Sequence, residues 1–227
     1  ICALAQTAAE VQQCDLWLRS LSAWYLARAC NHWAQPKRVR DAITIARRGF
    51  TSLDEQGWLA ACNWQENALS WTRPNFREAA QKLADALHGL EQHGPIEFLP
   101  DCRISLAYAQ ILLNQHEEAL ANLRRSAAAF SARNDELNQA RCWLFQASSL
   151  RRQDRFQEAH QTLEAALSGF AREGSLTDQA KARYQMALGH LLQIVLPEAI
   201  AQFTKSAELF EETELDLWHA LCINNLG

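Results

Sequence analysis

Seven cysteines and seven histidines are the residues of this chain that could act as nucleophiles or metal ligands. The most suggestive stretch is ARCWLFQA, residues 140–147, where Cys142 stands beside Trp143. A cysteine in such a place could be a nucleophile, a metal ligand, half of a disulfide or a small core residue. The positions of the other cysteines decide between these roles.

The cysteines and histidines match no known metal or catalytic signature. The sequence has no CxxC pair and no HExxH motif, and its histidines are not paired at zinc-ligand spacing. Cys30 and His32 are close together, but two ligands do not complete a site. A GxSxG turn and a phosphate-binding glycine loop are also missing from the sequence. We therefore predict that the chain is not an enzyme, binds no metal and needs no cofactor.

The cysteines belong to a repeat of forty residues. One position of the repeat is occupied by serine, cysteine or alanine. Because these residues share only their small size, we predict that the position is buried and serves packing. Equivalent positions in neighbouring repeats should lie about 10 Å apart, too far for a disulfide. We expect reduced thiols, which fit a cytoplasmic location. The position is occupied by Ser22, Cys62, Cys102, Cys142, Ala182 and Cys222.

A second set of positions in the same register forms one face of a helix. Its members follow at intervals of four, three and four residues and are alternately small and large, which predicts a buried helical stripe. In successive repeats these are Val39, Ile43, Ala46, Phe50; Ala79, Leu83, Ala86, Leu90; Ala119, Leu123, Ser126, Phe130; Ala159, Leu163, Ala166, Phe170; and Ala199, Phe203, Ser206, Phe210.

The register predicts an all-α, right-handed solenoid of stacked antiparallel helix pairs over residues 1–227. The predicted pairs are 13–53, 55–93, 95–133, 135–173 and 175–213, with partial repeats at 1–11 and 215–227 and a polar loop at 10–13. Pro36, Pro74 and Pro197 fall in turns between paired helices, and Gly94 and Gly174 fall at repeat ends. Neither end has a polar capping helix, so we expect a piece of a longer chain.

One further local signal concerns the start of the fifth pair. Ser175 followed three residues later by Asp178 predicts a cap for the helix that begins there.

The helix-pair positions resemble the tetratricopeptide repeat (TPR). In the stretch ARCWLFQASSLRRQDRFQEAHQTLEAAL, the matching residues are Trp143, Ala147, Phe156, Ala159, Leu163 and Ala166. Leu226 and Gly227 match the Leu-Gly pair of the motif. The period is forty instead of the usual thirty-four. This longer period resembles that of TPR arrays in large bacterial signalling proteins. In those proteins the array accompanies a caspase-like CHAT peptidase, an ATPase switch or a transcription regulator.

The resemblance implies that the first helix of each pair lines a concave binding groove. Aromatic and arginine side chains there would anchor a partner, and the arginines would favour acidic residues. The alternative is that some of these side chains pack against the neighbouring repeat. The lysine clamp of chaperone-binding TPR proteins is absent. The groove positions are Trp24, Arg28, Asn31, Trp64, Trp71, Tyr108, Arg151 and Tyr184.

The composition limits the classes of binding partner that we expect. Charged residues make up 21% of the 227 residues and the net charge is -4, which gives no reason to expect nucleic acid or an anionic membrane as a partner. No apolar run approaches the ~20 residues of a membrane span. Two functions remain: a scaffold that binds a separate protein or peptide, and a sensing or autoinhibitory arm that restrains an effector domain of the same chain.

Overall fold

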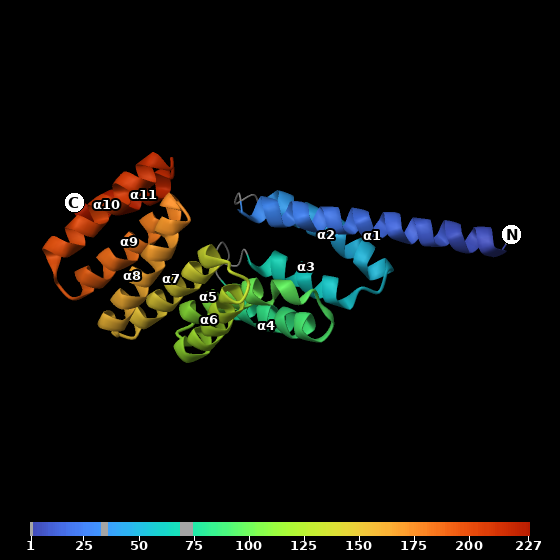
Figure 1. The fold of residues 1–227 in the computed structure, drawn as a ribbon, viewed down its shortest axis with the longest axis horizontal. Helices are drawn as coiled ribbons and strands as arrows, with labels where there is room; N and C mark the ends of the chain where they lie inside the picture. Colours follow the sequence, from blue (N-terminus) through green and yellow to red (C-terminus); the bar gives the residue numbers. More distant parts are fainter. Residues whose placement is uncertain (1, 33–35, 69–74) are drawn as a thin grey trace. The chain divides into compact units, whose positions relative to one another are not determined.

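The computed structural model describes the backbone of residues 2–32, 36–68 and 75–227, and the side chains of residues 12–30, 37–68 and 75–227. These residues form helices and contain no β-strand (Figure 1). The helices are α1 Cys2–His32, α2 Pro36–Ser52, α3 Gln56–Ala68, α4 Phe76–His93, the 3-10 turn η2 Ile96–Phe98, α5 Leu99–Leu112, α6 His116–Ser131, α7 Glu136–Arg152, α8 Phe156–Arg172, α9 Leu176–Leu192, α10 Leu196–Glu212 and α11 Asp216–Leu226.

The chain divides into two compact units, Ile1–Ala109 and Gln110–Gly227. Within each unit, a helix packs mainly against the helices that precede and follow it in the sequence. In unit 1, α1 packs on α2, α2 on α3, and α3 on α4. In unit 2, the same order runs from α6 to α11. The predicted all-α class of stacked helix pairs is therefore confirmed.

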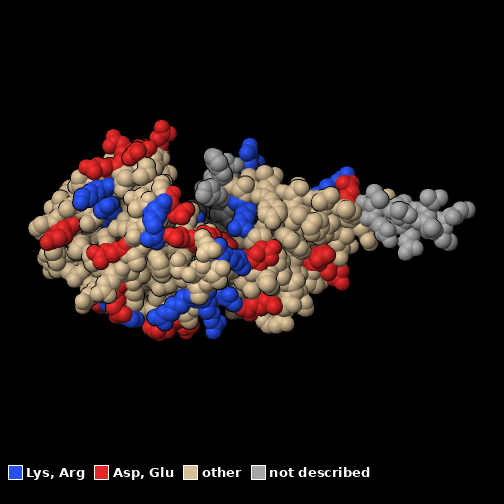
Figure 2. All heavy atoms as spheres, viewed as in Figure 1, with Lys and Arg blue, Asp and Glu red and all other residues tan. Residues whose placement is uncertain are grey.

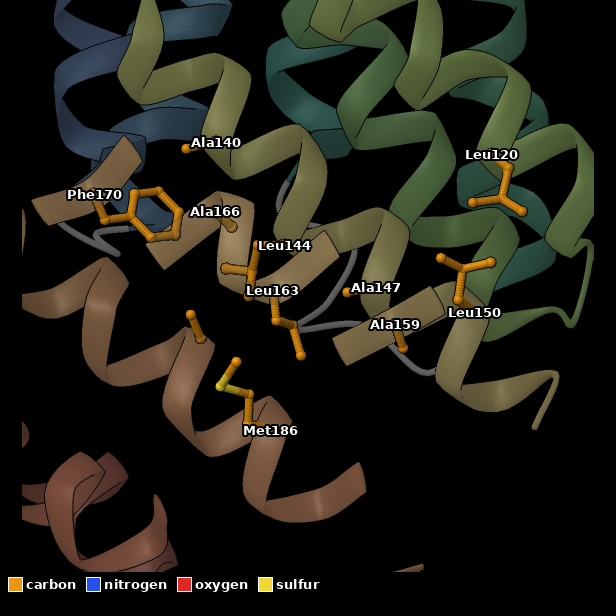
Figure 3. Close-up of a cluster of buried hydrophobic side chains, with 11 residues drawn as sticks. Leu120, Ala140, Leu144, Ala147, Leu150, Ala159, Leu163, Ala166, Phe170 and Met186 are labelled. Atoms are coloured by element: carbon orange, nitrogen blue, oxygen red, sulfur yellow. The ribbon is translucent and has the colours of Figure 1, made fainter. Parts of the chain in front are cut away.

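The predicted helical stripe forms the core of both units. Every member of the stripe is buried, and Phe50, Phe170 and Phe210 are completely inaccessible to solvent. Figure 3 shows one part of this core, where Leu163, Ala166 and Phe170 of α8 lie among side chains of α7 and α9. Small residues let the helix axes approach, and the large ones fill the space between them.

The cysteine position is buried as predicted from Cys62 onwards. Cys62, Cys102, Cys142 and Cys222 are fully buried free thiols. Burial raises the pKa of the Cys62 thiol to about 12, so it stays protonated and unreactive. Ser22 is exposed, which corrects the prediction at the first repeat. This position faces the preceding helix pair, as Cys222 shows by its 3.4 Å contact with Ser206 of α10, and no described helix precedes α1.

The polar stretch at residues 10–13, predicted as a loop, lies inside α1. The stretch is Glu-Val-Gln-Gln, and neither glycine nor proline occurs between Cys2 and His32. Glutamate and glutamine are good helix formers, so polarity alone does not end a helix here. The first partial repeat and the first helix of the first pair are consequently joined in one helix of 31 residues.

The junctions between helices reuse one turn. After α2 and after each helix from α5 to α10, a single residue adopts positive φ. The amide of the residue that follows it donates to a carbonyl of the last helical turn, as Arg155 N does to Leu150 O at 3.0 Å. Gly174 has this conformation (φ 66°), whereas Gly94 is extended (φ -97°). The residues at positive φ are Asp54, Asn114, Asn134, Asp154, Gly174, Ile194 and Glu214.

Candidate protein-binding surface

Two of the predicted anchors lie in the core of unit 1. Trp24 is fully buried and Trp64 is only 4% exposed. Their ring centroids lie 4.6 Å and 5.9 Å from that of Phe98, which η2 places against them. The Trp64 indole also donates a hydrogen bond to Ser105 Oγ at 3.0 Å. The expectation that these tryptophans contact a partner is therefore wrong, and the alternative of packing within the array applies to both.

Arg28 lies over this aromatic cluster. Its guanidinium carbon is 4.9 Å from the Phe98 centroid and 5.8 Å from that of Trp64, within cation–π range. One of its nitrogens lies 3.5 Å from Asp101 Oδ1, and 38% of the side chain remains exposed. The charge of Arg28 is thus already matched inside unit 1, so a partner would have to share it.

The remaining predicted residues of unit 1 differ in how far the structure describes them. Tyr108 is half-buried on α5. Trp71 and the side chain of Asn31 lie outside the described residues. A role for these three residues in binding stays a prediction.

In unit 2, Tyr184 and Arg151 lie on consecutive first helices, α9 and α7. Tyr184 is half-buried, and its ring makes edge contacts with Phe203 and Trp218 at centroid distances of 5.6 Å and 5.8 Å. Arg151 is also half-buried, and its Nη2 lies 3.3 Å from Gln185 Oε1. Burial and the neighbouring Arg152 lower the pKa of Arg151. Both side chains keep some accessible surface at which a partner could bind.

Arg151 borders a small open hollow between α7, α8 and α9. Leu163, Met186 and Ala159 form its apolar wall, and its volume is about 20 Å³, so it is a shallow site that can hold a small polar group. Two imidazoles at its edge, His160 and His190, pack edge to face with centroids 5.5 Å apart. The sequence did not indicate this pair, because the two histidines are thirty positions apart on different helices.

Unit 2 also contains a buried ion pair between α7 and α9. Asp178 is 4% exposed, and its carboxylate accepts from Arg141 of α7 at 2.8 Å and from Ser175 Oγ at 2.9 Å. Ser175 therefore bonds the Asp178 side chain, and no side chain caps the first turn of α9. The predicted side-chain cap of this helix is therefore wrong. Because Asp178 is buried beside α7, it pairs with Arg141 and links the two first helices.

Charge elsewhere on the surface is mixed. Lysine and arginine alternate with aspartate and glutamate over the visible face in Figure 2. Several of these side chains form exposed pairs, such as Arg172 with Glu136 at 2.8 Å and Arg155 with Glu158 at 2.7 Å. Such a surface favours no broad electrostatic attraction to a polyanion.

Comparison with known proteins gives similarity at the level of structure. No protein-family profile matches the sequence, and no curated protein matches it significantly. A signal-transduction ATPase (STAND protein) with a tetratricopeptide-repeat sensor from Pyrococcus horikoshii superposes with a TM-score of 0.63 at 10% identity, over 93% of this chain and 36% of that one. A protein of Podospora anserina with nearly identical TPR-like repeats gives 0.62 at 15% identity, over 86% of this chain and 96% of that one.

The chain has the fold of a tetratricopeptide-repeat array. A third TPR neighbour is a Rap protein solved in complex with Competence and Sporulation Factor, with a TM-score of 0.64 at 14% identity, over 97% of this chain and 71% of that one. In the TPR arrangement, α7 and α9 are first helices of their pairs, so Arg151, Tyr184 and Gln185 lie on first helices.

Two features of the described residues bear on metal binding and on membrane insertion. No group of three or more His, Cys, Asp or Glu side chains among them is placed to hold a metal ion. Within the same part of the chain, none of the helices combines the length and apolar character required to cross a membrane.

Proposed function

We propose that this TPR array binds a protein or peptide segment across the first helices of unit 2. The observation that carries the proposal is Arg151, a half-buried cation beside an open hollow with no carboxylate of the described residues within 4.0 Å. Side chains that already have partners, such as Arg141 and Tyr184, flank it along α7 and α9. The complex of the Rap protein with Competence and Sporulation Factor supports binding as the role of this fold.

Selection of peptides on the purified chain tests this proposal. A library of random twelve-residue peptides is displayed on phage and enriched on the 227-residue chain. A photo-crosslinking amino acid is then placed at Leu191 on α9, or at the exposed Ala165 on α8 as a matched control. We expect enriched peptides to crosslink from position 191 and not from 165. Crosslinking from 165 alone would place binding on the second helices and contradict the proposal.

We infer as a second candidate that the array is the sensor or autoinhibitory arm of a multidomain signalling protein. The STAND neighbour favours it, because its TPR region is a sensor and this chain spans only 36% of that protein. The complete gene provides the test. A peptidase dyad, an ATPase phosphate-binding loop or a DNA-binding regulator encoded in the same chain is the expected finding, and a gene that encodes only TPR repeats would refute it.

A further inference from the structure

The environment of Arg151 differs from that of Arg141, which lies on the same helix. Arg141 donates to Asp178 through Nε at 3.0 Å and Nη2 at 2.8 Å, so its charge is neutralised within the protein. Arg151 makes one long bond, to the neutral Oε1 of Gln185 at 3.3 Å. Its Nε–H is buried without an acceptor among the described residues. A guanidinium has five N–H donors, so most of the donors of Arg151 lack a protein acceptor.

This arrangement is unfavourable without a further partner. A buried donor without an acceptor, and a desolvated cation without a counterion, both cost stability. Burial lowers the pKa of Arg151, which reflects the loss of water around its charge. An anion in the hollow would supply the missing acceptors and compensate the charge.

Gly189 lines the hollow beside Arg151. It lies within α9, where glycine is a poor helix former, and repeat-equivalent positions carry Ser149 and Ala109. A Cβ added at Gly189 would meet only Arg151 Cδ, at 3.9 Å, so the space beside it is open. Position 189 thus contributes backbone and no side chain to the lining of the hollow.

Apolar side chains continue from the hollow towards the end of α9. His190 and Gln193 line the hollow, and between and after them lie Leu191, Leu192 and Ile194, which are 38%, 57% and 79% exposed. Ile194 adopts φ 61°, a left-handed conformation that β-branched residues rarely tolerate. The conformation belongs to the turn that ends α9, and the exposed side chain of Ile194 extends the apolar surface formed by Leu191 and Leu192.

We propose that the hollow at Arg151 is a carboxylate-binding subsite that recognises a peptide carrying an acidic group next to an apolar side chain. The carboxylate would accept from Arg151 and from the imidazole N–H of His190, because His160 Nε2 already lies 3.4 Å from Glu164 Oε1. The apolar side chain would pack on Leu191 and Leu192. The inference rests on the proposed peptide-binding function and specifies its ligand. The carboxylate could belong to an aspartate or glutamate side chain or to a peptide C-terminus.

The peptide selection tests the subsite. Enriched peptides are synthesised with a fluorescein label and an acetylated N-terminus, in one version with an amidated C-terminus and in another with a free one. The affinity of each version for the chain is measured by fluorescence anisotropy. We expect an acidic residue beside Leu, Ile, Val or Phe in the enriched set. Arg151→Gln should weaken binding about 10- to 100-fold, as expected for a charge-assisted hydrogen bond. The exposed neighbour provides a matched control, and Arg152→Gln should change affinity by less than about threefold.

A double-mutant cycle decides whether the carboxylate meets Arg151. When the peptide's acidic residue is replaced by its amide, binding should weaken in the wild type and change little further in Arg151→Gln, because the two losses describe one interaction. If the two losses of binding free energy were additive, the proposed contact between the carboxylate and Arg151 would be refuted. If amidation of the C-terminus abolishes binding instead, the bound carboxylate is the terminal one. Circular dichroism of Arg151→Gln must show the wild-type helix content and melting temperature; a large loss would assign Arg151 a structural role and refute the proposal.

The remaining outcomes separate this inference from the proposed function. Enriched peptides that lack a carboxylate, crosslink from position 191 and bind Arg151→Gln as tightly as wild type would refute the subsite and leave peptide binding intact. A selection that enriches no peptide at all would refute both.

Discussion

Replacement of Asp178 by asparagine should destabilise unit 2 substantially. The carboxylate is buried, and Arg141, Lys181 and Ser175 all bond to it, at distances from 2.8 to 3.5 Å. Removing one partner of a buried ion pair costs about 3–5 kcal/mol when the other partner stays buried. The Arg141 side chain is 35% exposed and can regain water, so we expect a smaller loss, about 2–3 kcal/mol of the free energy of unfolding.

The assay is urea unfolding of wild type and Asp178→Asn, followed by circular dichroism at pH 7. A matched control is Glu136→Gln, because Glu136 pairs with Arg172 at the same distance of 2.8 Å but with side chains 48% and 59% exposed. That exposed pair should contribute less than about 1 kcal/mol to the free energy of unfolding. Equal losses of stability for the two variants, or no loss for Asp178→Asn, would refute the argument that burial makes the Asp178–Arg141 pair the more stabilising one.

The pH dependence has a definite sign. Burial alone would raise the pKa of Asp178, but the charges of Arg141 and Lys181 and the hydrogen bonds from Arg141 and Ser175 outweigh it and hold the pKa below its usual range. A carboxyl with a depressed folded-state pKa stabilises the protein above its unfolded pKa of about 3.9, and this contribution is lost as pH falls through the folded pKa. The stability difference between wild type and Asp178→Asn should therefore be full at pH 7 and shrink below about pH 4.

Three further predictions test the core. Ala166→Asp places a charge at a fully buried position and should cost several kcal/mol, about 3 or more, seen as an earlier urea midpoint; an unchanged midpoint would contradict the repeat register. Trp64→Ala should cost about 3–5 kcal/mol in the same assay, since Trp64 is core and not a free anchor. In native protein a maleimide should label the exposed Cys14 at least about 100-fold faster than the buried Cys62, read by mass spectrometry; comparable rates would show that Cys62 is accessible.

The local patterns in the sequence predicted the buried stripe and the helices that carry it, but not the continuity of α1 through residues 10–13. Intervals of four, three and four residues place Leu163, Ala166 and Phe170 on one face whatever surrounds the helix, because the helical period is a property of the backbone. The recurrence of that stripe every forty residues then requires another stripe to pack against it. The small position at Cys142 follows from the same argument, since serine and alanine replace cysteine in its register.

The functional surface depended on contacts between segments far apart in the chain. Trp24 and Trp64 match groove positions, yet Phe98, brought in by η2, buries both of them. Nothing near Asp178 in sequence indicates that Arg141, thirty-seven positions earlier, neutralises it.

The contrast between Arg141 and Arg151 has the same origin. Both are arginines of one helix, and only the packing of α8 and α9 beside α7 decides that Arg141 meets a carboxylate while Arg151 faces a hollow. The sequence by itself determined which faces are apolar, because that depends on the order of residues along one helix. Tertiary structure decided which charges are neutralised and which aromatic rings are covered, because burial and pairing depend on the neighbouring helices.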